Sequence, residues 1–175
     1  MIKEKLDDVI RTIPDFPKEG ISFKDITPIL LDYNLTNDII DAFISALNGV
    51  KVDAIVGVES RGFLFGFLLA NKMEVPFIPI RKVGKLPGET IKYNYDLEYG
   101  SAEVEVHKND IKSDWNIVVH DDLLATGGTA VAASELILQL GARVSAFTFV
   151  VNLDFLNGKK ELEKYTNNII SLTNY

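Results

Sequence analysis

Residues 116–140 constrain the fold more than any other part of this chain. They open with an apolar run that predicts a buried strand of a parallel sheet, and two acids, Asp121 and Asp122, follow where that strand is expected to end. Small residues whose backbone N–H groups can surround an anion come next: Ala125, Thr126, Gly127, Gly128 and Thr129. A helical pattern over residues 130–140 then directs its positive N-terminal end at the same place. The segment therefore predicts a site that binds a sugar through its hydroxyls and a phosphate through backbone groups.

An ordinary strand–turn–helix with a glycine-rich bend is the alternative, but such a turn needs neither two acids nor two hydroxyls at these spacings. A second strand–turn–helix–strand pattern runs through residues 52–58, 59–62, 62–72 and 76–81. Further elements are expected at residues 2–10 (helix), 36–49 (helix capped by Thr36 or Asn37 and ended by Gly49), 102–107 (strand), 144–151 (strand), 158–165 (short helix) and 169–172 (short strand). This alternation predicts an α/β fold with a mainly parallel central sheet flanked by helices, and a ligand at the carboxyl ends of the strands.

Composition narrows the class of protein. The 175 residues suit one domain, and 47% hydrophobic with 25% charged residues is ordinary for a globular protein. The chain has no cysteine and two histidines, so a thiolate or histidine metal site is not expected, and its net charge of −7 disfavours nucleic acid as a partner. The most apolar run is far shorter than the ~20 residues of a membrane span, and the N-terminus has no signal core, so we expect a cytoplasmic protein without a membrane partner. No Walker-type lysine follows the glycine pair, and no G-x-G-x-x-G motif occurs.

Residues 116–130 resemble the phosphoribosyl pyrophosphate (PRPP) binding motif of the type I phosphoribosyltransferases, and their sequence looks most like that of the adenine branch of that family. The resemblance implies that Asp121 and Asp122 hold the ribose hydroxyls and that residues 125–129 bind the 5′-phosphate. It also implies a small base-binding hood, about residues 1–35, and a flexible loop, about residues 82–95. His120 stands where the family usually has an aliphatic residue, and a histidine that ends a strand is expected to be a hydrogen-bonded structural residue.

The N-terminal stretch resembles the same branch at Asp-Phe-Pro (residues 15–17), Gly20, Phe23 and Asp-Ile-Thr-Pro (residues 25–28). From spacing alone, the place of Phe23 is ambiguous, and the core is the favoured interpretation. The resemblance instead implies that Phe23 stacks on the purine while backbone groups near Ile21 and Lys24 read its edge. Many members have arginine where this chain has Lys24, a difference that leaves backbone recognition possible.

The resemblance assigns the remaining roles. Glu59, Ser60 and Arg61 correspond to the pyrophosphate loop, and Lys85 lies in the flexible loop that would cover the pyrophosphate; from the residues alone a disordered loop stays the alternative. Glu98, in a Leu-Glu-Tyr-Gly signature, is the candidate for proton transfer to and from the purine. The candidate catalytic residues are therefore Glu98, Arg61 and Lys85.

These assignments predict a phosphoribosyltransferase that converts adenine and PRPP into AMP and pyrophosphate. Mg²⁺ is expected to arrive with PRPP, with no residue assigned as a direct metal ligand, and family resemblance suggests a homodimer. Two alternatives stay open: transfer to another purine (hypoxanthine, guanine or xanthine), and a non-catalytic regulator that senses PRPP. The acidic chain with no added module disfavours a regulator, and the residues after Val151 carry no functional pattern.

Overall fold

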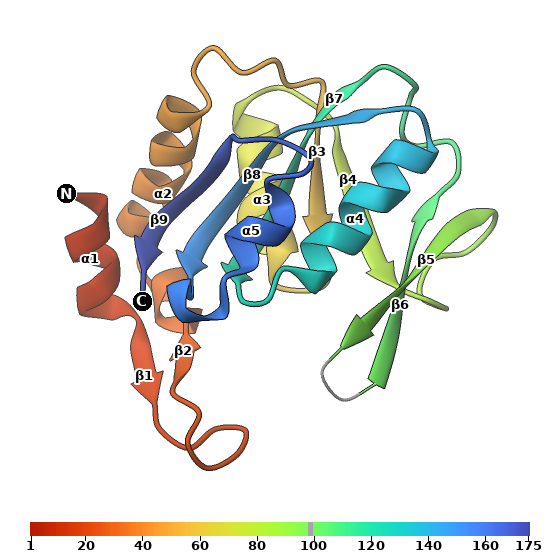
Figure 1. Ribbon diagram of the computed structural model, residues 1–175. Coiled ribbons are helices and arrows are strands. Elements are labelled where there is room, and N and C mark those ends of the chain that lie inside the picture. Colours follow the sequence, from red (N-terminus) through yellow and green to blue (C-terminus); the bar gives the residue numbers. More distant parts are fainter. Residues whose placement is uncertain (98–99) are drawn as a thin grey trace.

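A seven-stranded sheet forms the centre of the computed structural model, which describes residues 1–97 and 100–175 (Figure 1). Its strands lie in the order β5 (Thr90–Leu97), β6 (Gly100–His107), β4 (Phe77–Lys82), β3 (Ala54–Val58), β7 (Asn116–Leu124), β8 (Arg143–Asn152) and β9 (Ile169–Asn174). The neighbouring strands β4, β3, β7, β8 and β9 pair in parallel. Strand β6 pairs antiparallel with both β4 and β5. The predicted α/β fold with a mainly parallel sheet is confirmed.

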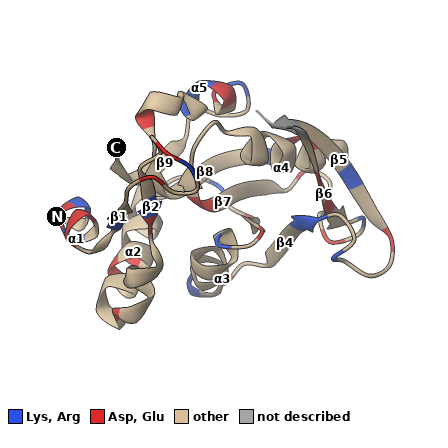
Figure 2. Cartoon of the chain, turned by 90° about the horizontal axis from the view of Figure 1, so that it is seen from below, with Lys and Arg blue, Asp and Glu red and all other residues tan. Residues whose placement is uncertain are grey.

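Helices cover both faces of this sheet, as Figure 2 shows from below. One face carries α1 (Ile2–Val9), α2 (Tyr33–Ala46) and α3 (Gly62–Lys72); the other carries α4 (Gly128–Gln139) and α5 (Gly158–Leu162). Two short 3-10 helices, η1 (Thr27–Leu31) and η2 (Asp154–Leu156), complete the connections. In the part of the chain that the structure describes, no helix has the length and apolar character needed to cross a membrane.

Each face of the sheet has its own hydrophobic core. Alternate residues of β7 enter the two cores: Ile117 and Val119 pack under α4, and Val118 packs under α2 and α3. Strands buried on both faces are expected to be apolar throughout, which explains why β3 and the first half of β7 are continuous hydrophobic runs.

A small second sheet lies apart from the first. Strands β1 (Arg11–Ile13) and β2 (Phe23–Asp25) pair antiparallel, with Ile13 opposite Phe23. This hairpin and the β5–β6 hairpin project from the same end of the molecule, the end at which the parallel strands terminate (Figure 1). Ligand sites of open α/β sheets lie at that end.

Three expectations from sequence are wrong in detail. Helix α2 begins three residues earlier than Thr36, because the Asp32 carboxylate accepts the backbone N–H of Leu35 at 3.0 Å and caps the helix there. Strand β7 does not end before the acidic pair but continues to Leu124, because β8 pairs with it that far. Half of the expected loop 82–95 is strand, since β4 includes Lys82 and β5 begins at Thr90.

Candidate functional site

The acidic pair lies in the last part of β7, beside the start of α3. The Asp122 side chain is buried, and its Oδ2 lies 3.0 Å from Nε of Arg61. This contact is an ion pair without hydrogen-bond alignment, because Oδ2 has no properly oriented donor among the described residues. Oδ1 of Asp121 accepts the backbone N–H of Asp122 at 2.9 Å. The pair therefore keeps acceptor capacity that a ligand hydroxyl can use.

Burial controls the protonation of both acids. It raises the pKa of Asp121 well above its ordinary value, and the neighbouring charge of Asp122 raises it further. Burial also raises the pKa of Asp122, against the opposing effect of the Arg61 guanidinium. A buried carboxylate gains from every donor that reaches it, so the hydroxyls of a sugar are suitable partners for this pair.

The turn after β7 has the form expected of an anion site. Gly127 adopts φ +89°, which favours glycine, and α4 begins at the next residue. The first N–H groups of a helix have no intrahelical partner and point out of its N-terminus. A small cavity of about 70 Å³ lies here, and residues 123–130, Asp121 and Phe149 line it. The predicted phosphate turn, residues 125–129, thus surrounds a space beside the acidic pair.

The turn after β3 brings α3 against β7. A Cβ on Gly62 would lie 2.9 Å from the His120 carbonyl oxygen and 3.0 Å from Oδ1 of Asp121, so only glycine permits this approach. Arg61 is thereby carried to Asp122, and Ser60 is exposed. The Glu59 carboxylate, in contrast, accepts the backbone N–H of Lys82 at 2.8 Å and pairs with Arg81 at 3.2 Å.

This engagement of Glu59 alters its expected part in pyrophosphate binding. Burial alone would raise its pKa, but the bonds from Lys82 and Arg81, with the nearby charge of Lys85, hold the pKa below the ordinary value. A carboxylate that remains charged would repel pyrophosphate if it faced the ligand. The Glu59 side chain is thus committed to protein contacts, and its backbone is the part left for a ligand.

The expected base region lies on the small hairpin. Phe23 is half-buried and belongs to neither hydrophobic core, so the core interpretation from spacing is wrong. Its ring packs edge-to-face on Phe16, with centroids 5.2 Å apart, and the Arg61 guanidinium carbon lies 5.7 Å from its centroid. Lys24 points elsewhere: Nζ donates to Oγ1 of Thr12 at 2.9 Å and lies over the Tyr175 ring. Ile21 is 37% exposed.

The expected catalytic residue Lys85 lies between β4 and β5, exposed in the loop of residues 83–89. Its backbone N–H donates to Oε1 of Glu105 at 2.9 Å. Glu98 lies outside the described residues, so its role stays a prediction.

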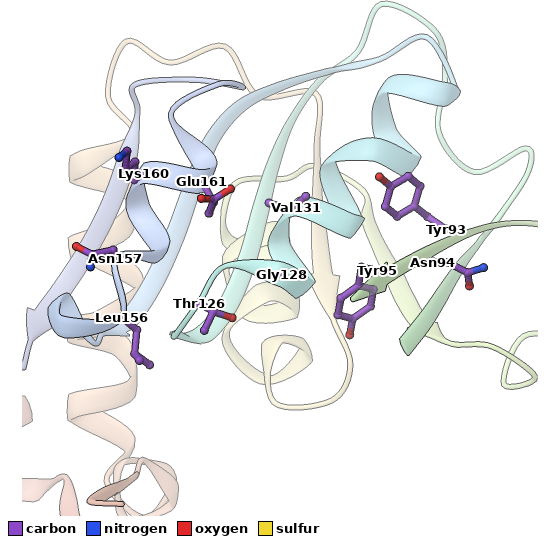
Figure 3. A pocket seen from close by; sticks show the side chains of 10 residues that line it. All are labelled: Tyr93, Asn94, Tyr95, Thr126, Gly128, Val131, Leu156, Asn157, Lys160 and Glu161. Atoms are coloured by element: carbon purple, nitrogen blue, oxygen red, sulfur yellow. The ribbon is translucent and has the colours of Figure 1, made fainter. Parts of the chain in front are cut away.

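Sequence reasoning missed one wall of the site. A cavity of about 570 Å³ opens next to the phosphate turn, and Leu156 and Asn157 line it opposite Tyr95 (Figure 3). Thr126 lies between these two sides. Leu156 and Asn157 come from η2 and the residue after it, about thirty residues beyond the phosphate turn, so no local motif joins them to it. The cavity does not reach the acidic pair.

His120 lies directly before the acidic pair but is separated from solvent. Its Nδ1 is 2.9 Å from Oγ1 of Thr148, and Nε2 has no partner among the residues described. Burial lowers its pKa to about 3. The expectation that His120 is hydrogen-bonded is confirmed, and the ring is uncharged at neutral pH.

Within the described part of the chain, the site offers a metal ion the two carboxylates of the acidic pair. Among residues 1–97 and 100–175, no group of three or more His, Cys, Asp or Glu side chains could hold a metal ion. Asp121 and Asp122 offer hard oxygen ligands at the site itself. Mg²⁺ commonly binds through one or two carboxylates, waters and substrate phosphates, so the residues present fit an ion that enters with a phosphorylated ligand.

Known proteins resemble this chain over its full length. The phosphoribosyl transferase domain model matches residues 29–174. The adenine phosphoribosyltransferase of Thermoanaerobacter pseudethanolicus is 48% identical over 175 residues, which cover 100% of both chains. Its crystal structure superposes with a TM-score of 0.95 over 100% of both chains at 47% identity. The Saccharomyces cerevisiae enzyme, crystallised with an imino-altritol bisphosphate and adenine, has a TM-score of 0.90 at 44% identity over 98% of each chain.

Proposed function

The chain belongs to the phosphoribosyl transferase family, and on that premise we propose that it transfers the 5-phosphoribosyl group of PRPP to adenine, giving AMP and pyrophosphate. The observation that carries the proposal is the meeting of two strand–helix turns at one acidic pair, with Arg61 3.0 Å from Asp122 and the 125–129 turn beside Asp121. PRPP presents a 5′-phosphate, two ribose hydroxyls and a pyrophosphate, and each has a matching group here.

The reaction breaks the anomeric C–O bond and leaves positive charge on the sugar and negative charge on the departing pyrophosphate. Asp121 and Asp122 would orient the ribose and favour its developing positive charge. Arg61, Lys85 and the backbone of Glu59 and Ser60 would stabilise the pyrophosphate, an electrostatic contribution that usually dominates such chemistry. The phosphate turn supplies binding energy away from the reacting carbon and so positions it.

Mg²⁺ would arrive with PRPP, and the carboxylates of Asp121 and Asp122 would be available to it as hard oxygen ligands. When bound, it would neutralise charge that collects on the phosphates. Glu98 would exchange the proton of the purine ring, a role for which a carboxylate within hydrogen-bond reach is suited.

We propose adenine as the base because the full-length relatives are adenine phosphoribosyltransferases; its stacking partner would be Phe23, which lies outside both hydrophobic cores. Its ring borders Arg61 and carries no polar group, so it suits any purine, and the choice among purines would rest on backbone groups near Ile21 and Lys24. The Lys24 side chain contacts Thr12 and Tyr175 instead, which supports recognition by backbone.

A homodimer and a cytoplasmic location complete the proposal. Helix α3 leaves an apolar strip of Leu64, Phe67 and Leu68 exposed, at 40%, 56% and 41%. An exposed apolar strip of this kind favours a protein interface, so we assign it to the contact between two copies. In sedimentation experiments, the unaltered chain should behave as a dimer and Phe67→Lys as a monomer.

The test is release of pyrophosphate from PRPP with adenine, hypoxanthine, guanine and xanthine in turn. Adenine presents a 6-amino donor and an N1 acceptor where hypoxanthine presents an O6 acceptor and an N1–H donor, so hypoxanthine would mismatch two backbone groups that fit adenine. At about 1–3 kcal/mol for each mismatch, discrimination against hypoxanthine should be roughly 10- to 10⁴-fold. Phe23→Ala should weaken every purine, whereas Lys24→Ala, the matched control, should leave base preference unchanged. Comparable rates with hypoxanthine would favour a broader purine transferase, and binding of PRPP without turnover of any base would favour a regulator.

A further inference from the structure

Both backbone polar groups of Lys85 are hydrogen-bonded to other side chains. Its N–H donates to Oε1 of Glu105 at 2.9 Å, and its carbonyl oxygen accepts from a guanidinium nitrogen of Arg81 at 3.4 Å. Arg81 in turn pairs with Glu59, the first residue of the turn that leads into α3. Glu105 of β6, directly, and Glu59 of the first turn, through Arg81, therefore fix one residue of an otherwise exposed loop.

Glu105 makes the stronger of these attachments. It lies in β6 with 2% of its surface exposed, and the same Oε1 also accepts the N–H of Leu86 at 2.9 Å. Its second oxygen, Oε2, accepts the hydroxyl of Thr90 at 3.0 Å. A buried carboxylate is costly unless its oxygens are bonded, and here two donors from the loop and one from the first residue of β5 meet that need. Removing the acid would deprive the Lys85 and Leu86 N–H groups of this acceptor.

The charge state of Glu105 agrees with this geometry. Burial alone would raise its pKa, but the bonds from Leu86, Thr90 and Lys85 outweigh burial and hold the pKa below its ordinary value. Glu105 is therefore ionised at neutral pH, and charge-assisted bonds of this type are stronger than neutral ones.

The loop has glycines where its path requires them. Gly84 and Gly88 adopt φ +87° and +81°, on either side of the bonded pair Lys85 and Leu86. The backbone thus turns at two points and is bonded between them, which gives Lys85 a defined starting point for its side chain.

We propose that Glu105 is a positioning residue that holds the backbone of Lys85 so that the lysine side chain reaches the pyrophosphate of PRPP. This inference rests on the proposed function, in which Lys85 binds that group. Glu105 itself touches no substrate. Its effect on the reaction passes through Lys85, and Glu59 with Arg81 supports the same residue from the other side.

The experiment compares Glu105→Leu with Glu105→Gln, each alone and with Lys85→Ala. Glutamine keeps an acceptor for both N–H groups and a donor for Thr90, whereas leucine removes every bond. We expect Glu105→Leu to lose roughly 10- to 100-fold in kcat/KM for PRPP, as loss of several buried bonds implies, and Glu105→Gln to restore most of it. In the Lys85→Ala background, Glu105→Leu should cost little more, because residues that act through one another are not additive.

Three controls separate positioning from general stability. Glu103→Gln alters a half-buried acid on the same strand and should change nothing. AMP lacks pyrophosphate, so AMP affinity by calorimetry should stay within about threefold in Glu105→Leu, well under the tenfold that 1.4 kcal/mol would give. Hydrogen exchange should show the Lys85 and Leu86 amides protected in the unaltered chain and in Glu105→Gln, and rapid in Glu105→Leu. If the leucine variant does not fold, Glu105→Asp, which shortens the side chain, serves in its place.

Equal losses with and without Lys85 would overturn the proposal, as would a parallel loss of AMP affinity or unchanged amide exchange. Two measurements require no turnover: hydrogen exchange, and calorimetric titration of the same variants with pyrophosphate in place of AMP. If the unaltered chain released no pyrophosphate with any purine, the proposed function would fail, while these two measurements would still decide whether Glu105 positions Lys85 for an anion.

Discussion

Two turns with the same place in the fold differ in how they are built. The first turn, residues 59–62, follows β3 and leads into α3; the second turn, residues 125–128, follows the neighbouring strand β7 and leads into α4. The first turn carries a cation, Arg61, that reaches the acidic pair. The second turn contains no charged residue, so it can bind an anion only through backbone N–H groups and the hydroxyls of Thr126 and of Thr129, which follows it in α4.

The packing behind each turn matches this difference. Behind the first turn, Gly62 lies against β7, which brings Arg61 to Asp122. Behind the second turn, a Cβ on Gly158 would lie 2.2 Å from the Ala125 carbonyl oxygen and 3.1 Å from the Gly127 nitrogen. The C-terminal segment therefore sets the shape of the second turn. The first turn should be sensitive to the loss of charge, and the second to changes in backbone shape.

The largest effect is expected at the acidic pair where both turns meet, and Asp122 is the member that contacts Arg61. Asp122→Asn keeps the shape but removes a charge directed at the sugar, so transition-state stabilisation should fall by roughly 2–4 kcal/mol, measured as kcat/KM for PRPP. Because the pKa of Asp122 is raised in the folded protein, the ionised acid costs stability above its unfolded pKa. The melting temperature at pH 7 should therefore not fall. Asp41→Asn, on the exposed surface of α2, is the control for loss of one charge; normal turnover of Asp122→Asn would exclude a role in ribose binding.

Arg61→Gln tests the first turn alone. Loss of its guanidinium should reduce affinity for PRPP and pyrophosphate by roughly 1–3 kcal/mol, the scale of a bond to a charged group, with AMP affinity little changed. Arg61→Lys keeps the charge but not the planar fork, and should recover part of the loss. If calorimetry showed equal losses for AMP and pyrophosphate, the two turns would not divide the ligand as we infer.

Gly158→Ala tests the second turn without altering any charge. The added methyl group must displace the Ala125 carbonyl, and overpacking of this kind costs about 1–3 kcal/mol. Part of that cost should appear as weaker binding of AMP and PRPP, while affinity for pyrophosphate is retained. Gly141→Ala is the control: Gly141 has φ +80° and a Cβ there would meet only Ser113, so it should lower stability alone. Unchanged AMP affinity in Gly158→Ala would show that the second turn tolerates a shift.

Local patterns predicted the parts of the fold that local forces determine. Helix α3 spans Gly62–Lys72, as its sequence indicates, since an apolar segment between two buried strands has one place to pack. The sequence does not determine the start of α2, because four residues near it, Asp32, Asn34, Thr36 and Asn37, are of types that cap helices, and only the backbone geometry at Asp32 selects among them.

Long-range contacts at the site could not be predicted. Glu105 meets Lys85 across twenty residues, and Gly158 meets Ala125 across thirty-three, and neither contact leaves a periodic signal in the sequence. The partner of Glu59 is a third contact that the sequence does not predict. The Glu59 motif indicates a ligand loop, but the partner of its carboxylate, Arg81, is fixed by the parallel pairing of β3 with β4.

The smallest effect on turnover is expected at His120, which lies beneath both turns. Its ring packs against Gly66 and its carbonyl against Gly62, but its Nδ1 bonds only to Thr148 and its Nε2 meets no donor or acceptor within the described residues. His120→Val removes a buried polar ring from an apolar setting, so kcat/KM should change by less than about 1 kcal/mol, within the range of tolerated core substitutions.

The pH dependence of stability distinguishes His120 from an inert core residue. Its folded pKa, about 3, lies below the ordinary value of 6.5, so the folded protein binds fewer protons than the unfolded chain between these values. Stability from this residue is present above pH 6.5 and is lost as the pH falls, at up to about 1.4 kcal/mol per pH unit. Urea unfolding of the unaltered chain and His120→Val from pH 7 to pH 4 should therefore show a shallower decline for the variant. Parallel curves would mean that His120 becomes protonated in the folded protein without cost, and large losses of turnover would mean that its ring supports the two turns.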